Sequence, residues 1–167
     1  MTLQIRLLGQ FVVMVGGEPI QDKAWRSRQT RTIFKRLLVP PGAIVTTSEL
    51  LHLLWPDQAE DAARRRLHVR ISELRRSLPE DAILTVDDGY RLNTAVPLHL
   101  DTRSFEALAE EGRCAQEQGD WAAAIHAYEA ARALYRGDLL EEDRYAAWIV
   151  PERERLRECY LTLLTEL

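Results

Sequence analysis

The sequence predicts an α+β amino-terminal half followed by an all-α carboxy-terminal half. Three observations support this: short apolar runs separated by glycines at the start, three successive amphipathic segments followed by a strand–turn–strand pattern, and helical periodicity alone after residue 97. The 167 residues are 46% hydrophobic and 29% charged, as in soluble globular proteins. We therefore expect two domains, residues 1–97 and residues 98–167.

The chain begins with two short apolar segments, 3–8 and 11–15, which are predicted strands of an antiparallel sheet because glycines separate and follow them. A helix is predicted over 25–38, since Ile33, Phe34 and its two final leucines share one helical face. The Pro40-Pro41-Gly42 sequence then ends it.

Two further helices and a hairpin complete this half. Thr46 and Glu49 have the spacing of a capping box, in which Thr accepts from first-turn amides and Glu reaches back. A longer helix covers 58–78, and 83–92 predicts a hairpin in which Asp88-Gly89 supplies positive φ. Strands, three helices and a hairpin are the order of a winged helix with an added N-terminal antiparallel sheet, in which the third helix contacts DNA.

The helix over 58–78 has two contrasting faces. At 100° per residue, Leu67, Ile71 and Leu74 fall on one apolar stripe, and a largely cationic face lies opposite. Arginine can bond to guanine, valine can touch a thymine methyl, and glutamate can accept from cytosine. The predicted base-reading residues are Arg65, Arg66, Val69 and Glu73.

Arginines on the shoulders of this helix, on the first helix and on the hairpin are expected to hold phosphates without reading sequence. Two alternatives stay open: the cationic face is the solvated side of an ordinary amphipathic helix, or the winged helix binds a protein partner instead of DNA. The predicted phosphate-binding residues are Arg26, Arg28, Arg31, Lys35, Arg36, Arg70, Ser72, Arg75, Arg76 and Arg91.

The charge is distributed unevenly, although the net charge of the whole chain is −4. Residues 1–100 contain 14 Lys and Arg against 11 Asp and Glu, whereas residues 101–167 contain 8 against 15. A basic half joined to an acidic half suggests one module for phosphate and another for a protein partner.

The acidic half is predicted to be wholly helical. Asp101 is expected to cap a helix that ends near Gln118, a second covers 121–135, and a third begins near Pro151. Small and aromatic residues fall at the positions of a tetratricopeptide-like hairpin, with a plain helical bundle as the alternative. These residues are Gly112, Gly119, Ala124, Tyr128 and Ala131.

Several classes of function lack any supporting motif. The sequence has no P-loop and no GxSxG, and its four histidines lack metal-ligand spacing. We therefore expect no enzymatic activity, no cofactor and no metal. Cys114 and Cys159 lack CxxC spacing and are expected to be reduced, and no signal peptide or membrane span is indicated, so the expected localisation is cytoplasmic.

Motifs spread over both halves resemble the Streptomyces antibiotic regulatory protein family, with an OmpR-type winged-helix DNA-binding domain followed by a bacterial transcriptional activation domain. The matching segments are Trp25–Arg28 through Pro41-Gly42, Leu54–Pro56, Leu74–Arg76, Gly89–Leu92, Asp101–Glu106, Leu134–Leu140, and Trp148 with Glu152–Leu156.

This resemblance implies an activator that binds direct repeats in double-stranded promoter DNA, with two copies on the repeats, and that recruits RNA polymerase holoenzyme through its sigma subunit. Gln29-Thr30 stands where the family commonly has Lys-Ala, and Arg66, His68 and Glu73 alter the reading face. The family's activation domain usually continues for several more helices. Two other functions stay open beside that of an activator: a protein-interaction module, and the N-terminal regulatory portion of a larger signalling ATPase.

Overall fold

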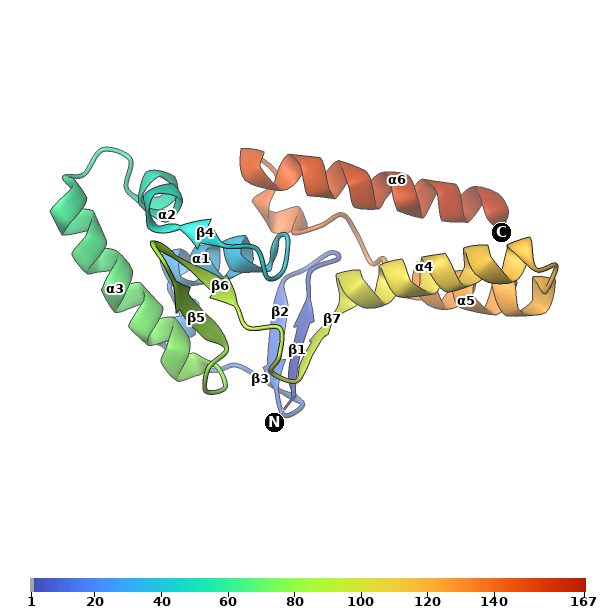
Figure 1. Cartoon of the computed structure of the whole chain (residues 1–167), viewed down its shortest axis with the longest axis horizontal. Helices are drawn as coiled ribbons and strands as arrows, with labels where there is room; N and C mark the ends of the chain where they lie inside the picture. Colours follow the sequence, from blue (N-terminus) through green and yellow to red (C-terminus); the bar gives the residue numbers. More distant parts are fainter. Residues whose placement is uncertain (1) are drawn as a thin grey trace. The chain divides into compact units, whose positions relative to one another are not determined.

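The computed structural model describes residues 2–167 and confirms an α+β part followed by a helical part (Figure 1). The chain divides into two compact units. One comprises the chain up to Leu3 together with Met14–Leu98, and the other comprises Gln4–Val13 together with His99–Leu167. No sequence pattern had indicated that residues 4–13 belong with the helical part.

The expected N-terminal sheet is present and has four strands. Strands β2 and β3 are antiparallel, with Met14 opposite Pro19 and Val15 opposite Glu18. The side chains of Leu3, Ile5 and Val13 are buried on this sheet. The strand order is β3-β2-β1-β7, formed by β1 (Leu3–Arg6), β2 (Val12–Val15), β3 (Glu18–Pro19) and β7 (Leu98–Leu100).

The first helix begins later than predicted. Ser27 is extended, with ψ 124°, so the expected helix over 25–38 divides into a short 3₁₀ turn and α1. The break lets Trp25 fold back onto Phe34, with 5.5 Å between ring centroids and an edge-to-face angle of 73°. The helical elements here are η1 (Ala24–Arg26), α1 (Arg28–Leu38), α2 (Thr47–Leu54) and α3 (Glu60–Ser77).

Half of the predicted capping box is formed at the start of α2. The Thr46 hydroxyl accepts from the Glu49 amide at 3.1 Å, as the spacing predicts. The Glu49 carboxylate does not reach back to the cap; it accepts from the Arg36 guanidinium at 3.4 Å.

A three-stranded sheet follows the order β4-β6-β5, from β4 (Val45–Thr46), β5 (Ile83–Val86) and β6 (Gly89–Leu92). The hairpin is present, but the positive φ is at Asp87 (48°) and not at Gly89. Gly89 is required for another reason, because a Cβ there would lie 2.4 Å from the Val45 carbonyl oxygen of the paired strand.

In the second unit, α4 and α5 form an antiparallel pair with a tight interface. A Cβ on Gly112 would lie 2.5 Å from the Tyr128 ring, so only glycine admits this tyrosine. Ala124 and Ala131 of α5 are also buried, as predicted for a tetratricopeptide-like pair. The helical elements are α4 (Asp101–Glu117), α5 (Trp121–Leu134), η2 (Glu141–Asp143), η3 (Ala147–Ile149) and α6 (Val150–Glu166).

The prediction that Asp101 caps α4 is wrong. Asp101 is the first residue of the helix, and its buried carboxylate accepts from the backbone amides of Leu7 at 2.8 Å and Leu8 at 3.1 Å. Burial raises the pKa of this carboxyl above its usual 3.8, although both amide bonds and the Arg136 charge favour the ionised form. Asp101 therefore fastens the N-terminal segment to α4.

Arg153 on α6 organises the connection that precedes it. The side chain is buried and donates to the carbonyls of Leu139 (2.9 Å), Leu140 (3.1 Å), Asp143 (3.1 Å) and Arg144 (3.1 Å). Leu140 has a left-handed φ of 47°, a conformation that costs a leucine of the order of 1 kcal/mol. The guanidinium holds this strained turn in place.

Across residues 2–167, no helix has the length and apolar character to cross a membrane.

Candidate nucleic-acid interface

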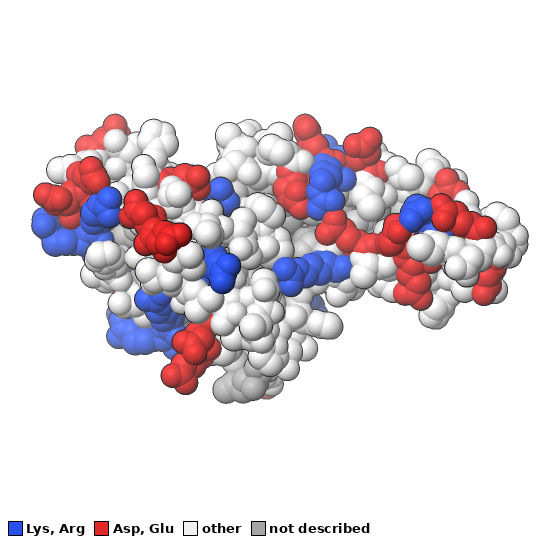
Figure 2. Space-filling view, in the orientation of Figure 1, with Lys and Arg blue, Asp and Glu red and all other residues white. Residues whose placement is uncertain are grey.

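The helix α3 has the two faces that its periodicity predicts. Leu67, Ile71 and Leu74 are at most 2% exposed and face the interior of the first unit. Their packing against α1 and α2 leaves the opposite face in solvent. Figure 2 shows basic side chains toward both ends of α3, with acidic side chains beside the upper group.

Three of the four predicted base-reading residues stand together on this exposed face. Val69 is 54% exposed, so an apolar side chain lies in solvent beside the charged ones. Arg65 and Arg66 are exposed, and among the described residues neither guanidinium has an ion-pair or hydrogen-bond partner. Together with Gln29 and Arg70 they line a shallow hollow of about 250 Å³. Free cations around an apolar side chain suit the edges of bases in a groove.

Glu73, the fourth, is engaged within the protein. Its side chain is 19% exposed, and its Oε2 accepts from Arg70 Nη1 at 2.7 Å and from Thr30 Oγ1 at 3.2 Å. Arg70 Nε also donates to Gln29 Oε1 at 3.1 Å. The carboxylate thus already has two donors, so it is poorly placed to accept from cytosine.

The predicted phosphate-binding residues divide into an exposed group and an engaged group. Lys35 is only 5% exposed and so does not offer its ammonium to a phosphate. Arg36 donates to the Val39 carbonyl at 2.9 Å and to Glu49, and Arg31 is partly buried. The exposed group comprises Arg26, Arg28, Ser72, Arg76 and Arg91.

Arg75 joins α3 to the hairpin. Its Nη2 donates to the Ile83 carbonyl at 3.2 Å and to Thr85 Oγ1 at 2.8 Å, and its guanidinium lies 5.9 Å from the Tyr90 ring centroid. These bonds fix the position of β5 and β6 against the helix. Arg75 is therefore a residue that positions the wing.

Two α1 residues of this cluster, Gln29 and Thr30, were not predicted as site residues from the sequence. They were noted only as departures from the family pattern. Both side chains bond to α3, through Arg70 and Glu73 respectively. The signal available in the sequence was polarity: Thr30 is a hydroxyl residue on the buried side of an amphipathic helix, where it needs a partner.

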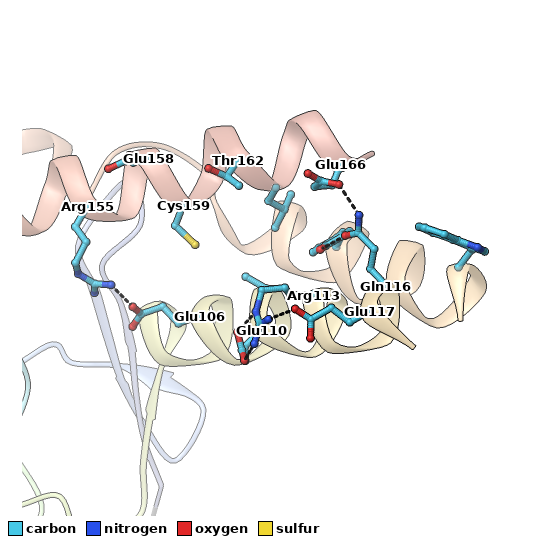
Figure 3. Close-up of a pocket in the computed structure, with 14 residues that line it drawn as sticks. Glu106, Glu110, Arg113, Gln116, Glu117, Arg155, Glu158, Cys159, Thr162 and Glu166 are labelled. Atoms are coloured by element: carbon cyan, nitrogen blue, oxygen red, sulfur yellow. Dashed lines mark hydrogen bonds and ion pairs between the residues drawn. The ribbon is translucent and has the colours of Figure 1, made fainter. Parts of the chain in front are cut away.

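The second unit contains a groove of about 860 Å³ between α4 and α6 (Figure 3). Its two arginines are both paired with carboxylates: Arg113 with Glu110 and Glu117, and Arg155 with Glu106. Arg113 accordingly lowers the pKa of Glu110. This groove therefore presents no free cation to a nucleic acid.

Among residues 2–167, no cluster of three or more His, Cys, Asp or Glu could hold a metal ion.

Comparisons with known proteins match the two halves of the chain to two different domains. Residues 21–92 match the family model "Transcriptional regulatory protein, C terminal", and residues 100–167 match "Bacterial transcriptional activator domain". Regulatory protein DnrI of Streptomyces peucetius is 31% identical over 173 residues, which covers 97% of this chain and 62% of DnrI. Transcriptional regulatory protein MoaR1 of Mycobacterium tuberculosis is 27% identical over 143 residues, which covers 82% of this chain and 46% of MoaR1.

A solved structure has the same fold. Mycobacterium tuberculosis EmbR, in complex with a low-affinity phosphopeptide, superposes with a TM-score of 0.84 at 24% identity, covering 98% of this chain and 44% of EmbR. The chain spans less than two thirds of the length of each of these proteins. With both domain models matched in the expected order, the chain belongs to the Streptomyces antibiotic regulatory protein family, with an OmpR-type DNA-binding domain followed by a bacterial transcriptional activator domain.

Proposed function

We propose that this chain is a sequence-specific transcription activator that places α3 in the major groove of double-stranded promoter DNA. The observation that carries the proposal is the exposed pair Arg65 and Arg66 beside Val69, which has no partner among residues 2–167 and lies on a helix whose other side is buried. The match of residues 21–92 to a transcriptional-regulator domain and the similarity to DnrI support the same function.

In this proposal Arg65, Arg66 and Val69 contact base edges. The β5–β6 hairpin is the wing, held by Arg75, and Glu73 is no longer included among the base-reading residues. Contacts to phosphates fix orientation without carrying sequence information. We assign them to the exposed side chains of Arg26, Arg28, Ser72, Arg76 and Arg91.

The second unit is proposed to contact RNA polymerase, through the sigma subunit of the holoenzyme, with two copies of the chain on direct repeats. The acidic composition of residues 101–167 and the match to an activator domain support a protein partner. Transcription by purified holoenzyme, from a promoter with the preferred site upstream, should rise when the chain is added. Unchanged transcription at saturating occupancy of the site would remove the activator role and leave DNA binding.

The experiment that tests DNA binding is a mobility-shift titration. Because the operator is unknown, the probe is a pool of duplexes with 20 randomised base pairs, from which bound sequences are recovered over several rounds. Wild type should enrich one motif, and its affinity should fall steeply with salt, by about 0.9 log units per phosphate contact per log unit of salt.

The variant for this test replaces Arg65, Arg66 and Val69 together by Ala. It should lose the enriched motif but keep most of the salt-dependent, non-specific binding, because the phosphate contacts remain. If wild type enriches nothing, or if it binds with little salt dependence, the winged helix serves a protein partner instead.

A further inference from the structure

A polar network links α1 to α3 behind the proposed base-reading face. Arg70 donates from Nε to Gln29 Oε1 at 3.1 Å and from Nη1 to Glu73 Oε2 at 2.7 Å. The same Glu73 oxygen accepts from Thr30 Oγ1 at 3.2 Å. Two hydrogen bonds therefore connect the helices, one between Gln29 and Arg70 and one between Thr30 and Glu73. The two α3 side chains, Arg70 and Glu73, are also bonded to each other.

The network lies partly inside the protein. Thr30 is fully buried at 0% exposure, and the Arg70 and Glu73 side chains are 31% and 19% exposed. Removal from water strengthens charge-assisted hydrogen bonds relative to a surface ion pair. A buried Thr30 has no path to DNA, so it can influence binding only through the groups it touches.

Its position connects it to the face that we assign to the bases. Gln29 and Arg70 line the same shallow hollow as Arg65, Arg66 and Val69. Arg70 lies one residue beyond Val69 along α3 and one turn beyond Arg66, so a shift in its anchoring would turn these side chains relative to the groove.

We propose that Gln29, Thr30, Arg70 and Glu73 form a positioning network that sets the orientation of α3 in the groove and thereby determines which bases are preferred. This inference rests on the proposed function and deepens it. Thr30 is the decisive member: it controls specificity without contacting DNA. Arg70 and Glu73, for their part, act through their mutual bond and not as direct readers.

The test compares sequence preference between variants, using the randomised duplex pool described above. Thr30→Val keeps the shape of the side chain and removes its hydroxyl, whereas Thr30→Ser keeps the hydroxyl. Thr32→Val is the matched control, because the Thr32 hydroxyl donates to the Arg28 carbonyl of its own helix at 2.9 Å. Thermal unfolding of each variant establishes that it is folded.

We expect Thr30→Val to reduce discrimination at two or more neighbouring base pairs by about 5-fold or more, within the range of coupling between residues in contact. Thr30→Ser and Thr32→Val should retain the wild-type motif. If Thr30→Val does not fold, Thr30→Ala serves the same test, since it removes the hydroxyl without adding bulk.

A double-mutant cycle with Glu73→Met separates positioning from direct contact. If the network acts as one unit, Thr30→Val should change preference by less than about 2-fold once Glu73 is already Met. An unchanged motif in Thr30→Val overturns the proposal. So does a loss at a single base pair in Glu73→Met that adds independently to Thr30→Val, because Glu73 would then read that base itself.

These outcomes are distinct from failure of the proposed function. If the proposed function fails, folded wild-type protein enriches no motif from the pool. Failure of the positioning network instead leaves the wild-type motif in place and insensitive to Thr30.

Discussion

Two arginine-rich stretches of this chain, Arg64–Arg76 on α3 and Arg153–Arg157 on α6, have opposite environments. On α3, Arg65 and Arg66 project into solvent with no partner among residues 2–167. On α6, Arg153 is buried against carbonyls, Arg155 pairs with Glu106 and Glu152, and Arg157 pairs with Asp138. A high density of arginine therefore does not by itself identify a nucleic-acid surface, and we assign to DNA only arginines of α3 that lack partners.

The difference originates in the local sequence. In α6, glutamates alternate with the arginines, and residues three or four apart on a helix are neighbours, so Arg155 finds Glu152 at 2.6 Å. In α3, three consecutive arginines share the helix with few acids. Arg64 pairs with Glu60 at 3.0 Å, and among residues 2–167 neither Arg65 nor Arg66 forms an ion pair, although Asp61 lies four residues before Arg65. Figure 2 shows acidic and basic side chains interleaved over the helical unit.

The strongest test of this comparison is removal of the buried arginine. Arg153→Met should lower the free energy of unfolding by about 3 kcal/mol, because it leaves buried carbonyls without a donor and releases the strained turn at Leu140. Urea denaturation measures it. Arg65→Met and exposed Arg103→Met should each stay within about 0.5 kcal/mol of wild type. Equal stability of all three variants would mean that the α6 arginine is dispensable.

The next test measures DNA affinity in place of stability. Arg65→Ala and Arg66→Ala should each weaken binding to the enriched motif by about 10- to 100-fold, the cost of a good base contact of about 1–3 kcal/mol. Arg155→Ala and Arg157→Ala should change it by less than about 2-fold, since their charges are already neutralised. Fluorescence anisotropy with a labelled duplex measures all four. A similar loss in the α6 variants would argue that both stretches meet DNA.

Within α3, neighbouring arginines should also separate. Arg75→Met should cost about 1 kcal/mol of stability by freeing the hairpin. Arg76→Met should leave stability unchanged, weaken binding to all DNA sequences alike and reduce the salt slope by about 1. Within the described part of the chain, the only bond of the Arg76 side chain is from Nε to the Ser72 carbonyl at 3.4 Å. The two variants are compared by denaturation and by titration at several salt concentrations. The assignment fails if Arg75 alters the salt slope and Arg76 does not.

Much of the fold could be predicted because it depends on local patterns. The apolar stripe of α3, the Thr46 cap and the proline in the first turn of α6 are all set within a few residues of the sequence. The errors occurred where a distant segment supplies the partner. Asp101 bonds to Leu7 and Leu8, and Gly89 accommodates Val45, and neither relation has a local signature.

The candidate site was predictable to the same degree. Helical periodicity placed Arg65, Arg66 and Val69 on the exposed face, but it could not show that Glu73 is taken by Thr30 and Arg70. Periodicity gives the direction of a side chain, whereas engagement depends on the neighbouring helix. Lys35 is the same case: it is buried, although its position in an arginine-rich helix suggested a phosphate contact.

The smallest effect concerns pH and the last arginine of the α6 stretch. Arg157 Nε donates to Asp138 Oδ1 at 3.0 Å, which lowers the pKa of that carboxyl below its usual 3.8, with help from the Tyr135 hydroxyl at 2.9 Å. A carboxyl whose pKa is lower in the folded state stabilises the fold fully above its unfolded value, and this contribution disappears as the pH falls through the folded value. Because the side chains are 33% and 49% exposed, solvent screening limits the contribution to about 0.5 kcal/mol.

The measurement is the difference in unfolding free energy between wild type and Asp138→Asn at pH 7 and at pH 3. It should be positive at pH 7 and shrink at pH 3, where wild type also loses the carboxylate. Asp120→Asn on the α5 cap is not a suitable control, since its carboxylate bonds to the Ala123 amide; Asp57→Asn, at an exposed turn residue before α3, is better. A difference that grows on acidification would mean that Asp138 is held as the neutral acid. In that case Arg157 would have a free charge like those of α3, and the contrast between the two stretches would be lost at this residue.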